Sequence, residues 1–289
     1  MTALYVVIDD NVIPREGKKP GRPKHLSDAE LVCLVVAQHL LQVKTERRWI
    51  RYARKNLRHL FPFIPQQSGY HERAKAAANL VCRAQLYLAS RCPSWSDEVR
   101  LIDGTPLPCG SSRETVKRSD LAGEAGYGYC AAHSRFYWGF KLYLVTTLEG
   151  IPVAWCLATP KLGEAEVCAE LLAWARDGKM LPDQVFLIGD KGFDGREWHR
   201  AMTELRITFA RPDKKNEGFK HGSLGGVRQR IEAIIDTLKD QLTLEDHNGR
   251  TPEGVFSRVA ARILALTAAI WNNWRTGQPV LRSLTAYDH

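Results

Sequence analysis

The segment VRLIDGTPLPC at residues 99–109 marks the point where the chain changes from a helical pattern to a strand-rich one. The apolar run before Asp103 and the Gly-Thr-Pro turn signal after it predict a short strand that ends at this aspartate. QVFLIGDKGF at 184–193 repeats the pattern and predicts a second strand that ends at Asp190. Either aspartate alone is more typical of an Asx turn, but two carboxylates at strand ends favour a site for chemistry.

The residues that follow this segment predict a mixed sheet with helices on both faces. Strand patterns at 137–147 and 151–159 are joined by the hairpin signal Leu-Glu-Gly. Later strand patterns alternate with helical ones, which are expected at 162–178, 195–205, 228–242 and 251–277. Strands close in sequence pair antiparallel, whereas strands separated by helices are typical of parallel pairing. The sequence therefore predicts an α/β fold for residues 96–289.

Residues 1–95 instead predict an all-helical module, compatible with a helix-turn-helix arrangement. Ser27 and Glu30 form a capping-box pattern that opens a helix reaching about residue 43, and a further helix is expected over 71–91. Between these helices, basic residues spaced by 3 and 4 predict one continuous stripe that contacts phosphates. The stripe comprises Lys44, Arg48, Arg51, Lys55 and Arg58.

Charge is distributed unevenly along the chain. Residues 1–100 hold 17 of the 41 Lys and Arg but only 9 of the 32 Asp and Glu, so this part carries +8 of the formal charge of +9. A basic module beside a nearly neutral one favours a polyanion partner, with nucleic acid as the first candidate. Seven cysteines without a C-x-x-C pair argue against a disulfide framework and a zinc knuckle, and they fit a reducing cytosol. No segment reads as a signal peptide, and the apolar stretch LVCLVVAQHLL is too short to span a membrane.

The helix expected at 228–242 carries one acid on a basic stripe. Spacings of 4 and 7 place Arg228, Glu232 and Lys239 at nearly one angle, beside an apolar arc that faces a core. An i,i+4 ion pair between Arg228 and Glu232 is the simplest explanation of this helix taken alone. With Asp103 and Asp190, however, Glu232 completes a set of three carboxylates that resist ionising together. A hard dication with oxygen ligands would relieve that repulsion, and two ions roughly 3.5–4 Å apart would suit displacement at phosphorus.

The motifs IDGTPLPC, YWGFKLYLV with GIPVAWCLAT, GDKGFDG and R-x-x-x-E-x-x-x-x-x-x-K, in this order, resemble bacterial insertion-sequence DDE transposases. The resemblance runs from about residue 98 to 275 and implies a ribonuclease-H-like catalytic domain. It also implies that Asp103, Asp190 and Glu232 are the catalytic triad and the ligands of Mg²⁺ or Mn²⁺. Arg228 and Lys239 match the basic positions that flank the family's glutamate. Many relatives carry a tyrosine three residues before that arginine, where this chain has Gly225.

The expected function is therefore DNA transposition, in which the element ends are cut and the freed 3′-hydroxyl is joined to target DNA. The expected partners are the terminal inverted repeats, the target duplex and a second copy of the chain, in a cytoplasmic, nucleoid-associated complex without a membrane. Lys214 and Lys215 lie in a basic loop and are further candidates for DNA contact, although a solvated loop explains them equally well. Two alternatives stay open at this point: a metal-dependent nuclease without strand transfer, and a DNA-binding protein whose catalytic domain has decayed.

Overall fold

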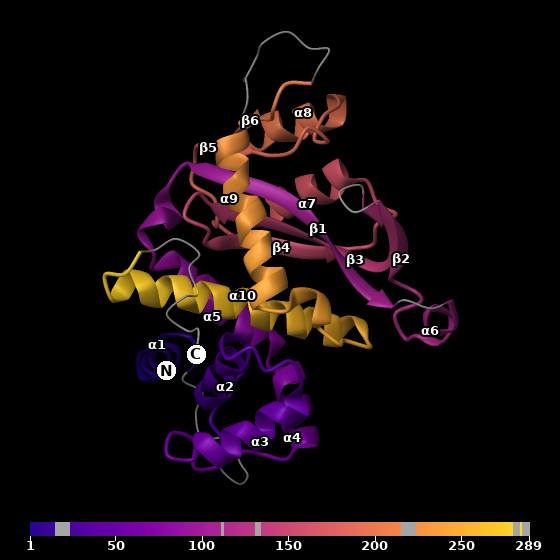
Figure 1. Ribbon diagram of the computed structural model, residues 1–289. Coiled ribbons are helices and arrows are strands. Elements are labelled where there is room, and N and C mark those ends of the chain that lie inside the picture. Colours follow the sequence, from indigo (N-terminus) through magenta and orange to yellow (C-terminus); the bar gives the residue numbers. More distant parts are fainter. Residues whose placement is uncertain (15–23, 111–112, 131–133, 215–223, 280–283, 285–289) are drawn as a thin grey trace.

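A six-stranded mixed sheet forms the centre of the second part of the chain (Figure 1). The computed structural model describes residues 1–14, 24–110, 113–130, 134–214, 224–279 and 284. The strands are β1 (Val99–Gly110), β2 (Gly126–Cys130), β3 (Arg135–Thr147), β4 (Pro152–Ala158), β5 (Val185–Ile188) and β6 (Ile207–Ala210). β3 pairs antiparallel with β1 along one edge and with β2 and β4 along the other, while β5 and β6 run parallel to β1. These directions confirm the predicted mixed sheet.

β1 is longer than the sequence predicts. It does not end at Asp103 but continues through Gly-Thr-Pro to Gly110, paired with β3 for most of its length. β5 pairs with residues 99–101 of β1, and among the described residues no strand pairs with that edge of β1 beyond this point. Proline lacks an N–H donor and is tolerated on such an edge, which is why Pro106 does not end the strand.

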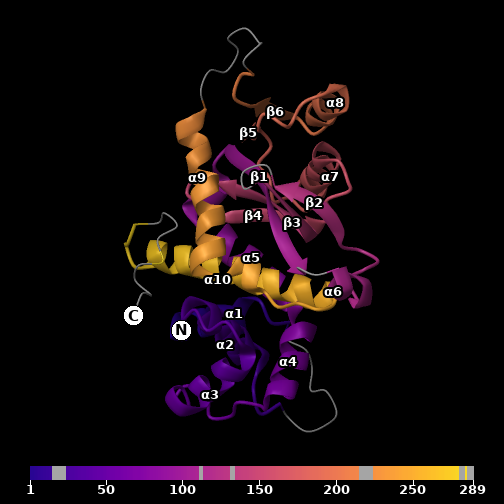
Figure 2. The ribbon, with the colours of Figure 1, turned by 45° about the vertical axis from the view of Figure 1, so that its right-hand side comes forward.

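Helices cover both faces of the sheet (Figure 2). One face carries α9 (Gly225–Asp236), whose Ile231 and Ile235 pack with Leu101 and Ile188. The opposite face carries α7 (Glu164–Asp177) and α8 (Arg196–Glu204), which pack with Ile102. Because side chains alternate along a strand, odd and even positions of β1 face different helices.

The first part of the chain is helical, as predicted, but its elements differ in detail. It contains α1 (Thr2–Asn11), α2 (Asp28–Leu40), α3 (Glu46–Asn56), α4 (Gln67–Ala76) and α5 (Ala78–Ser90). Ser27 accepts a hydrogen bond from the Glu30 backbone, and the Glu30 side chain accepts one from Ser27, which confirms the capping box. The single helix predicted over 71–91 is two helices that meet at Ala77: α4 packs on α2, α3 and the C-terminal helix, whereas α5 packs mainly along the C-terminal helix.

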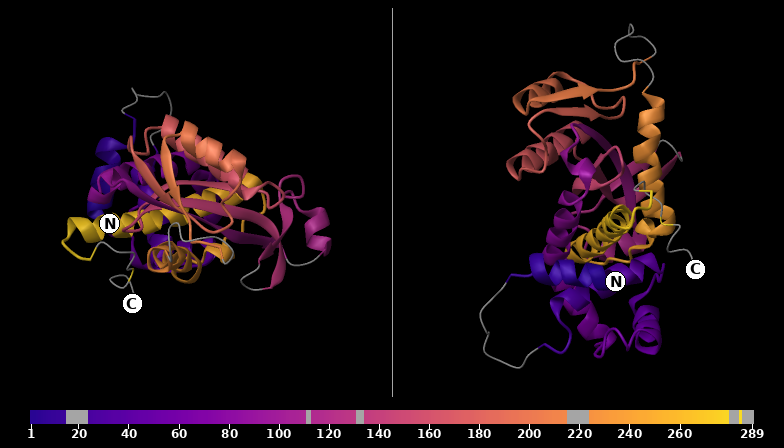
Figure 3. Two further views of the ribbon diagram at one scale, coloured as in Figure 1. Left: turned by 90° about the horizontal axis from the view of Figure 1, so that it is seen from above. Right: turned by 90° about the vertical axis from the view of Figure 1, so that its left-hand side faces the viewer.

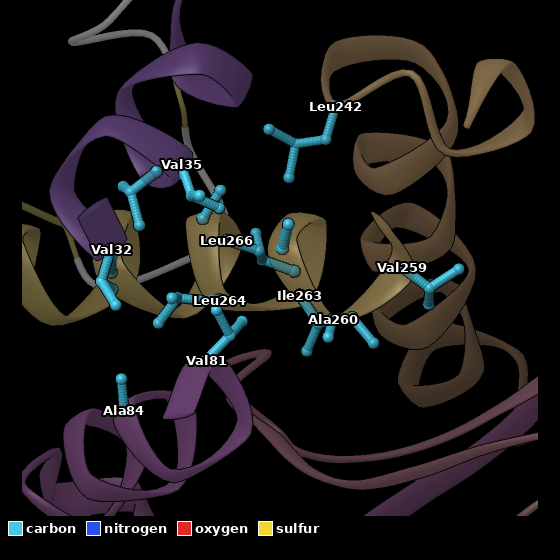
Figure 4. Close-up of a cluster of buried hydrophobic side chains, with 14 of the residues drawn as sticks. Val32, Val35, Val81, Ala84, Leu242, Val259, Ala260, Ile263, Leu264 and Leu266 are labelled. Atoms are coloured by element: carbon cyan, nitrogen blue, oxygen red, sulfur yellow. The ribbon is translucent and has the colours of Figure 1, made fainter. Parts of the chain in front are cut away.

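That C-terminal helix, α10 (Pro252–Arg275), lies between the helical module and the sheet (Figure 3). Its N-cap Thr251 accepts a hydrogen bond from the Gly254 backbone, as the sequence predicts. Ile263, Leu264 and Leu266 share a core with residues of α2 and α5 (Figure 4). α10 is long and apolar enough to cross a membrane, but 83% of its apolar window is buried inside the protein, as in a core helix.

Shorter helical segments complete the described residues. They are η1 (Pro93–Ser96), α6 (Arg113–Arg118), the π-helical turn η3 (Thr237–Gln241) and η4 (Leu244–Asp246). η3 continues α9. The backbone N–H of Leu242 donates to the carbonyl of Thr237, and this i to i+5 hydrogen bond widens the helix at its C-terminal end.

Candidate active site

Asp103 and Asp190 lie side by side because of the register between β1 and β5. The last parallel pair is Leu101 with Ile188, and each aspartate follows its strand residue by two positions. Two residues on, both side chains return to the face of the sheet that α9 covers. Adjacent strands are about 4.8 Å apart, so the two carboxylates meet at one edge of the sheet.

Glu232 reaches the same edge from α9, and Arg228 links it to Asp190. The Arg228 guanidinium lies 3.2 Å from Asp190 Oδ1 and 3.2 Å from Glu232 Oε1. The i,i+4 ion pair expected from the sequence is therefore present, but the arginine also contacts an acid distant in the chain. The side chain of Arg228 is 20% exposed, whereas those of Asp190 and Glu232 are 48% and 49% exposed. The two carboxylates are thus open to a ligand, and the arginine lies beneath them.

Asp103 is the most shielded of the three acids. Burial raises its pKa to about 6, and the negative charges of Asp190 and Glu164 act in the same direction, against the hydrogen bond from the Gly104 backbone and the nearby Arg228. Glu164, at the start of α7, accepts a hydrogen bond from Lys141 Nζ at 2.9 Å. Sequence analysis did not single out this pair, since an acid in the first turn of a helix is common for reasons of the helix dipole alone.

The three carboxylates offer the donor chemistry of a hard dication. All their ligand atoms are oxygens, and a half-buried carboxylate with a raised pKa gains from a nearby cation. Within the described part of the chain, however, no three Asp, Glu, His or Cys side chains already form a group that would hold a metal ion. In this structure Arg228 supplies the positive charge among the acids. The donor atoms therefore suit a hard divalent cation, although the acids as arranged here, with Arg228 among them, do not form a site for one.

The raised pKa of Asp103 predicts an unusual pH dependence of stability. The folded state holds this proton more tightly than the unfolded state, so the free energy of unfolding falls as the pH rises from about 4 to about 6. Asp103→Asn removes the buried charge. In EDTA we expect this variant to be more stable than the wild type by up to about 2 kcal/mol at pH 7.5. The measurement is urea unfolding at several pH values.

The difference between Asp103→Asn and the wild type should close below about pH 3, where Asp103 is protonated in both folded and unfolded chains. Asp177→Asn, at the exposed end of α7, is the matched control and should follow the wild-type curve. Parallel curves for Asp103→Asn and wild type across this range would show that Asp103 is not held in a shielded position.

Lys239 lies apart from the acidic cluster. It lies within the π turn η3, so the stripe predicted from regular α-helical spacing does not continue to it. Its ammonium group lies 3.5 Å from Glu245, and the side chain is 20% exposed. A contact between Lys239 and DNA stays a prediction. The lysine lies beyond the C-terminal end of α9 at Asp236.

The basic stripe of the N-terminal module is shorter than predicted. Arg48, Arg51 and Lys55 are exposed along α3, opposite the buried Ile50 and Ala53. Lys44 precedes the helix and pairs with Asp246 at 2.7 Å, and Arg58 follows the helix end at Asn56. The prediction of one stripe from Lys44 to Arg58 assumed a longer helix. α3 is bounded by its N-cap Thr45 and its C-cap Leu57. α3 lies at one end of the molecule, whereas β5, β6 and α8 lie at the other (Figures 1 and 2).

The basic loop is only partly described. Lys214 Nζ lies 2.5 Å from Asp194 Oδ2, and Arg211 contacts the same carboxylate at 3.1 Å. Hydrogen bonds from Lys214 and the Gly195 backbone hold the pKa of Asp194 well below its usual range. Asp194 thus ties the end of β6 to the segment after Asp190. The sequence shows it as the second acid of GDKGFDG, but its basic partners Arg211 and Lys214 lie 17 and 20 residues away. Lys215 lies outside the described residues.

Comparison with known proteins places these observations in a family. Among solved structures the chain is similar to the Drosophila P element transposase strand transfer complex, with 14% identity, a TM-score of 0.32 and 72% of this chain covered. The chain spans 40% of the length of that transposase chain. It is also similar to the Mos1 strand transfer complex, with 13% identity, a TM-score of 0.31, and 94% of this chain and 83% of that chain covered. No curated protein sequence matches the chain. The family model described as "Transposase DDE domain" matches residues 94–268, more than half of the sequence, and the chain therefore belongs to this family.

Proposed function

We propose that this protein is a DNA transposase that cuts the ends of its element and joins them to target DNA. The observation that carries the proposal is the convergence of Asp103, Asp190 and Glu232 on Arg228, within the segment that matches the transposase family. The proposed partners are duplex DNA at the inverted repeats and at the target, with two copies of the chain acting together in the cytoplasm at the nucleoid.

The proposed reaction is two successive phosphoryl transfers. In the first, water attacks a phosphodiester, the new P–O bond forms, and the bond to the 3′ oxygen breaks to leave a 3′-hydroxyl. In the second, that hydroxyl attacks a phosphodiester of the target, and the target's own 3′ oxygen leaves with a proton. When bound, two Mg²⁺ or Mn²⁺ ions would stabilise the charge on the phosphoryl oxygens and lower the pKa of water.

The residues of the chain have separate roles in this scheme. Asp190 and Glu232, half exposed, present oxygen ligands on the outer side of the cluster. Asp103 presents its oxygens from the shielded side, where burial raises its pKa to about 6 in the absence of a cation, so a bound cation would favour its ionised form. If cations replaced it beside Asp190 and Glu232, Arg228 would be free to bind a DNA phosphate.

A strand-transfer assay tests the proposal. Labelled element ends, a supercoiled target and Mg²⁺ or Mn²⁺ are mixed with the full-length protein. Joined products support transposition. Cut ends without joining would point to a nuclease, and binding without cleavage would point to a DNA-binding protein with an inactive catalytic domain. Either of the last two results overturns the proposal.

The N-terminal helix α3 should contribute to DNA binding through phosphates. Replacing Arg48, Arg51 and Lys55 with alanine should reduce the slope of log K against log salt by about 2 to 3, because each lost phosphate contact contributes about 0.9. The measurement is fluorescence anisotropy of a labelled duplex at several salt concentrations.

The matched control replaces three exposed basic residues on the far side of the sheet, Lys179, Arg200 and Arg206. We expect this control variant to keep the wild-type salt slope. An unchanged slope in the α3 variant would remove α3 from the DNA interface.

A further inference from the structure

The ion pair between Lys141 and Glu164 lies on the face of the sheet that α7 covers, opposite to the Asp103 side chain. Lys141 extends from β3, and Glu164 is the first residue of α7. Lys141 Nζ donates to Glu164 Oε1 at 2.9 Å and lies 5.1 Å from the centre of the buried Tyr143 ring. The side chains of Lys141 and Glu164 are only 22% and 35% exposed. An ammonium group held between a carboxylate and an aromatic face has little freedom to move.

Lys141 packs on the backbone beside Asp103. The Asp103 carboxylate accepts a hydrogen bond from the backbone N–H of the next residue, Gly104, at 2.7 Å. A Cβ at Gly104 would lie 2.8 Å from both Lys141 Cε and the Tyr143 ring, closer than Cβ atoms come to other atoms. The lysine stem and the tyrosine ring therefore occupy the space of a side chain at this position. They limit the movement of the N–H group that orients the Asp103 carboxylate.

Glu164 lies beside the turn that carries Asp190. A Cβ at Gly192, two residues after Asp190, would lie 3.9 Å from Glu164 Oε2, an ordinary contact distance. The Glu164 carboxylate thus has one oxygen on Lys141 and the other toward this turn. Burial is the main cause of the raised pKa of Asp103, and Glu164 is close enough for its negative charge to add to that effect. One ion pair therefore borders both of the segments that carry the aspartates.

We propose that Lys141 and Glu164 are positioning residues that fix the separation and orientation of the Asp103 and Asp190 carboxylates. The proposal rests on the function proposed above and assigns a role in the reaction to a pair outside the acidic cluster. β1 and β5 stop pairing two residues before the aspartates, so strand pairing alone does not hold the two carboxylates at one separation. Phosphoryl transfer needs that precision, because a misplacement of about 1 Å can lower a rate by about a hundredfold.

Amide hydrogen exchange of the full chain in EDTA, followed by NMR, tests the proposal without DNA or any catalytic step. Lys141→Met keeps most of the stem but removes the ammonium group, so Glu164 loses its partner. We expect the Gly104 amide to exchange about tenfold faster than in the wild type, whereas the amides of Leu142 and Leu144 in β3 should change by less than about twofold. Uniformly faster exchange throughout β1 and β3, or unchanged exchange at Gly104, would overturn the proposal.

Matched variants separate the ion pair from its two members. Lys141→Arg should keep wild-type exchange at Gly104, since a guanidinium group can also donate to Glu164. Glu164→Ala should resemble Lys141→Met, and the double variant should exchange no faster than either, because both changes remove the same interaction. Lys75→Met breaks the 3.7 Å pair with Glu253 between α4 and α10, and as the control it should leave exchange at Gly104 unchanged. Additive effects of the two single changes would show that the residues act separately, against the proposal.

Cleavage kinetics connect the pair with the proposed function. At saturating DNA, Lys141→Met should lower the single-turnover cleavage rate by about tenfold or more, with DNA affinity within about twofold of wild type, and Lys141→Arg should keep the wild-type rate. A wild-type rate in Lys141→Met, or a loss confined to DNA affinity, would show that the pair does not position the aspartates. If the wild type itself does not cut DNA, the proposed function is wrong, but selective exchange at Gly104 would still show that the pair fixes the backbone beside Asp103.

Discussion

Asp103→Asn should abolish DNA cleavage, lowering its rate by about a thousandfold or more, a loss typical of removing a group that acts only in the transition state. Asparagine has nearly the same shape but carries no charge, so the shielded side of the acidic cluster can no longer contribute an anionic ligand. Binding of the DNA end should stay within about twofold of wild type, because phosphate contacts come mainly from basic side chains. Gel electrophoresis of a labelled end measures cleavage, and a band-shift measures binding.

Asp177→Asn serves as the control for this experiment, since its carboxyl lies at the exposed end of α7. It should cleave at the wild-type rate. Asp190→Asn and Glu232→Gln should resemble Asp103→Asn, because all three carboxylates lie near Arg228 and are proposed to act together. Cleavage at the wild-type rate by Asp103→Asn would show that the acidic cluster is not the catalytic site.

Arg262→Ala should cost about 3 to 5 kcal/mol of the free energy of unfolding, because it leaves several buried carbonyl groups without a donor. Arg262 is 2% exposed. Its guanidinium donates to the carbonyls of Leu242, Thr243 and Arg258 at 2.9 to 3.1 Å. Burial, with a smaller contribution from nearby Arg258, lowers its pKa to about 10, so the charge persists at neutral pH. Urea unfolding followed by circular dichroism is the measurement.

The position of Arg262 also connects stability with the active site. It fixes the turn after η3, and η3 is the continuation of the helix that carries Glu232. Arg275→Ala, near the exposed end of α10, is the control and should cost less than about 1 kcal/mol. If Arg262→Ala unfolds at the same urea concentration as this control, the buried hydrogen bonds do not stabilise the connection between α9 and α10.

The sequence was sufficient for elements whose signals are local. The capping box at Ser27, the N-cap at Thr251 and the alternation of strands and helices after residue 150 are all present in the structure. The sequence was insufficient where contacts between residues far apart in the chain determine the local structure. Gly-Thr-Pro reads as a strand end, but β3 holds β1 extended through Pro106 along its one paired edge. Neither α1 nor β2 was predicted, because each depends on packing against distant elements for its stability.

For the candidate site, too, the sequence predicted the features that depend on local patterns and missed those that depend on distant contacts. Strand patterns and helical spacing were enough to nominate Asp103, Asp190 and Glu232, and β1–β5 pairing brings the two aspartates together. The role of Arg228 as a bridge between two acids was not visible, because helical spacing reveals only its i,i+4 partner. The displacement of Lys239 was also hidden, since a π turn has no clear local signature in sequence.

The pairing of Leu101 with Ile188 limits how this gene can change by insertion or deletion. An added or lost residue between 99 and 103 would turn the Asp103 carboxylate toward the α7 face, and a change between 185 and 190 would do the same to Asp190. An insertion between residues 111 and 184 does not change the face of the sheet to which either aspartate points. Descendants of this sequence should therefore vary in length within that interval while the two short segments keep a fixed count of residues.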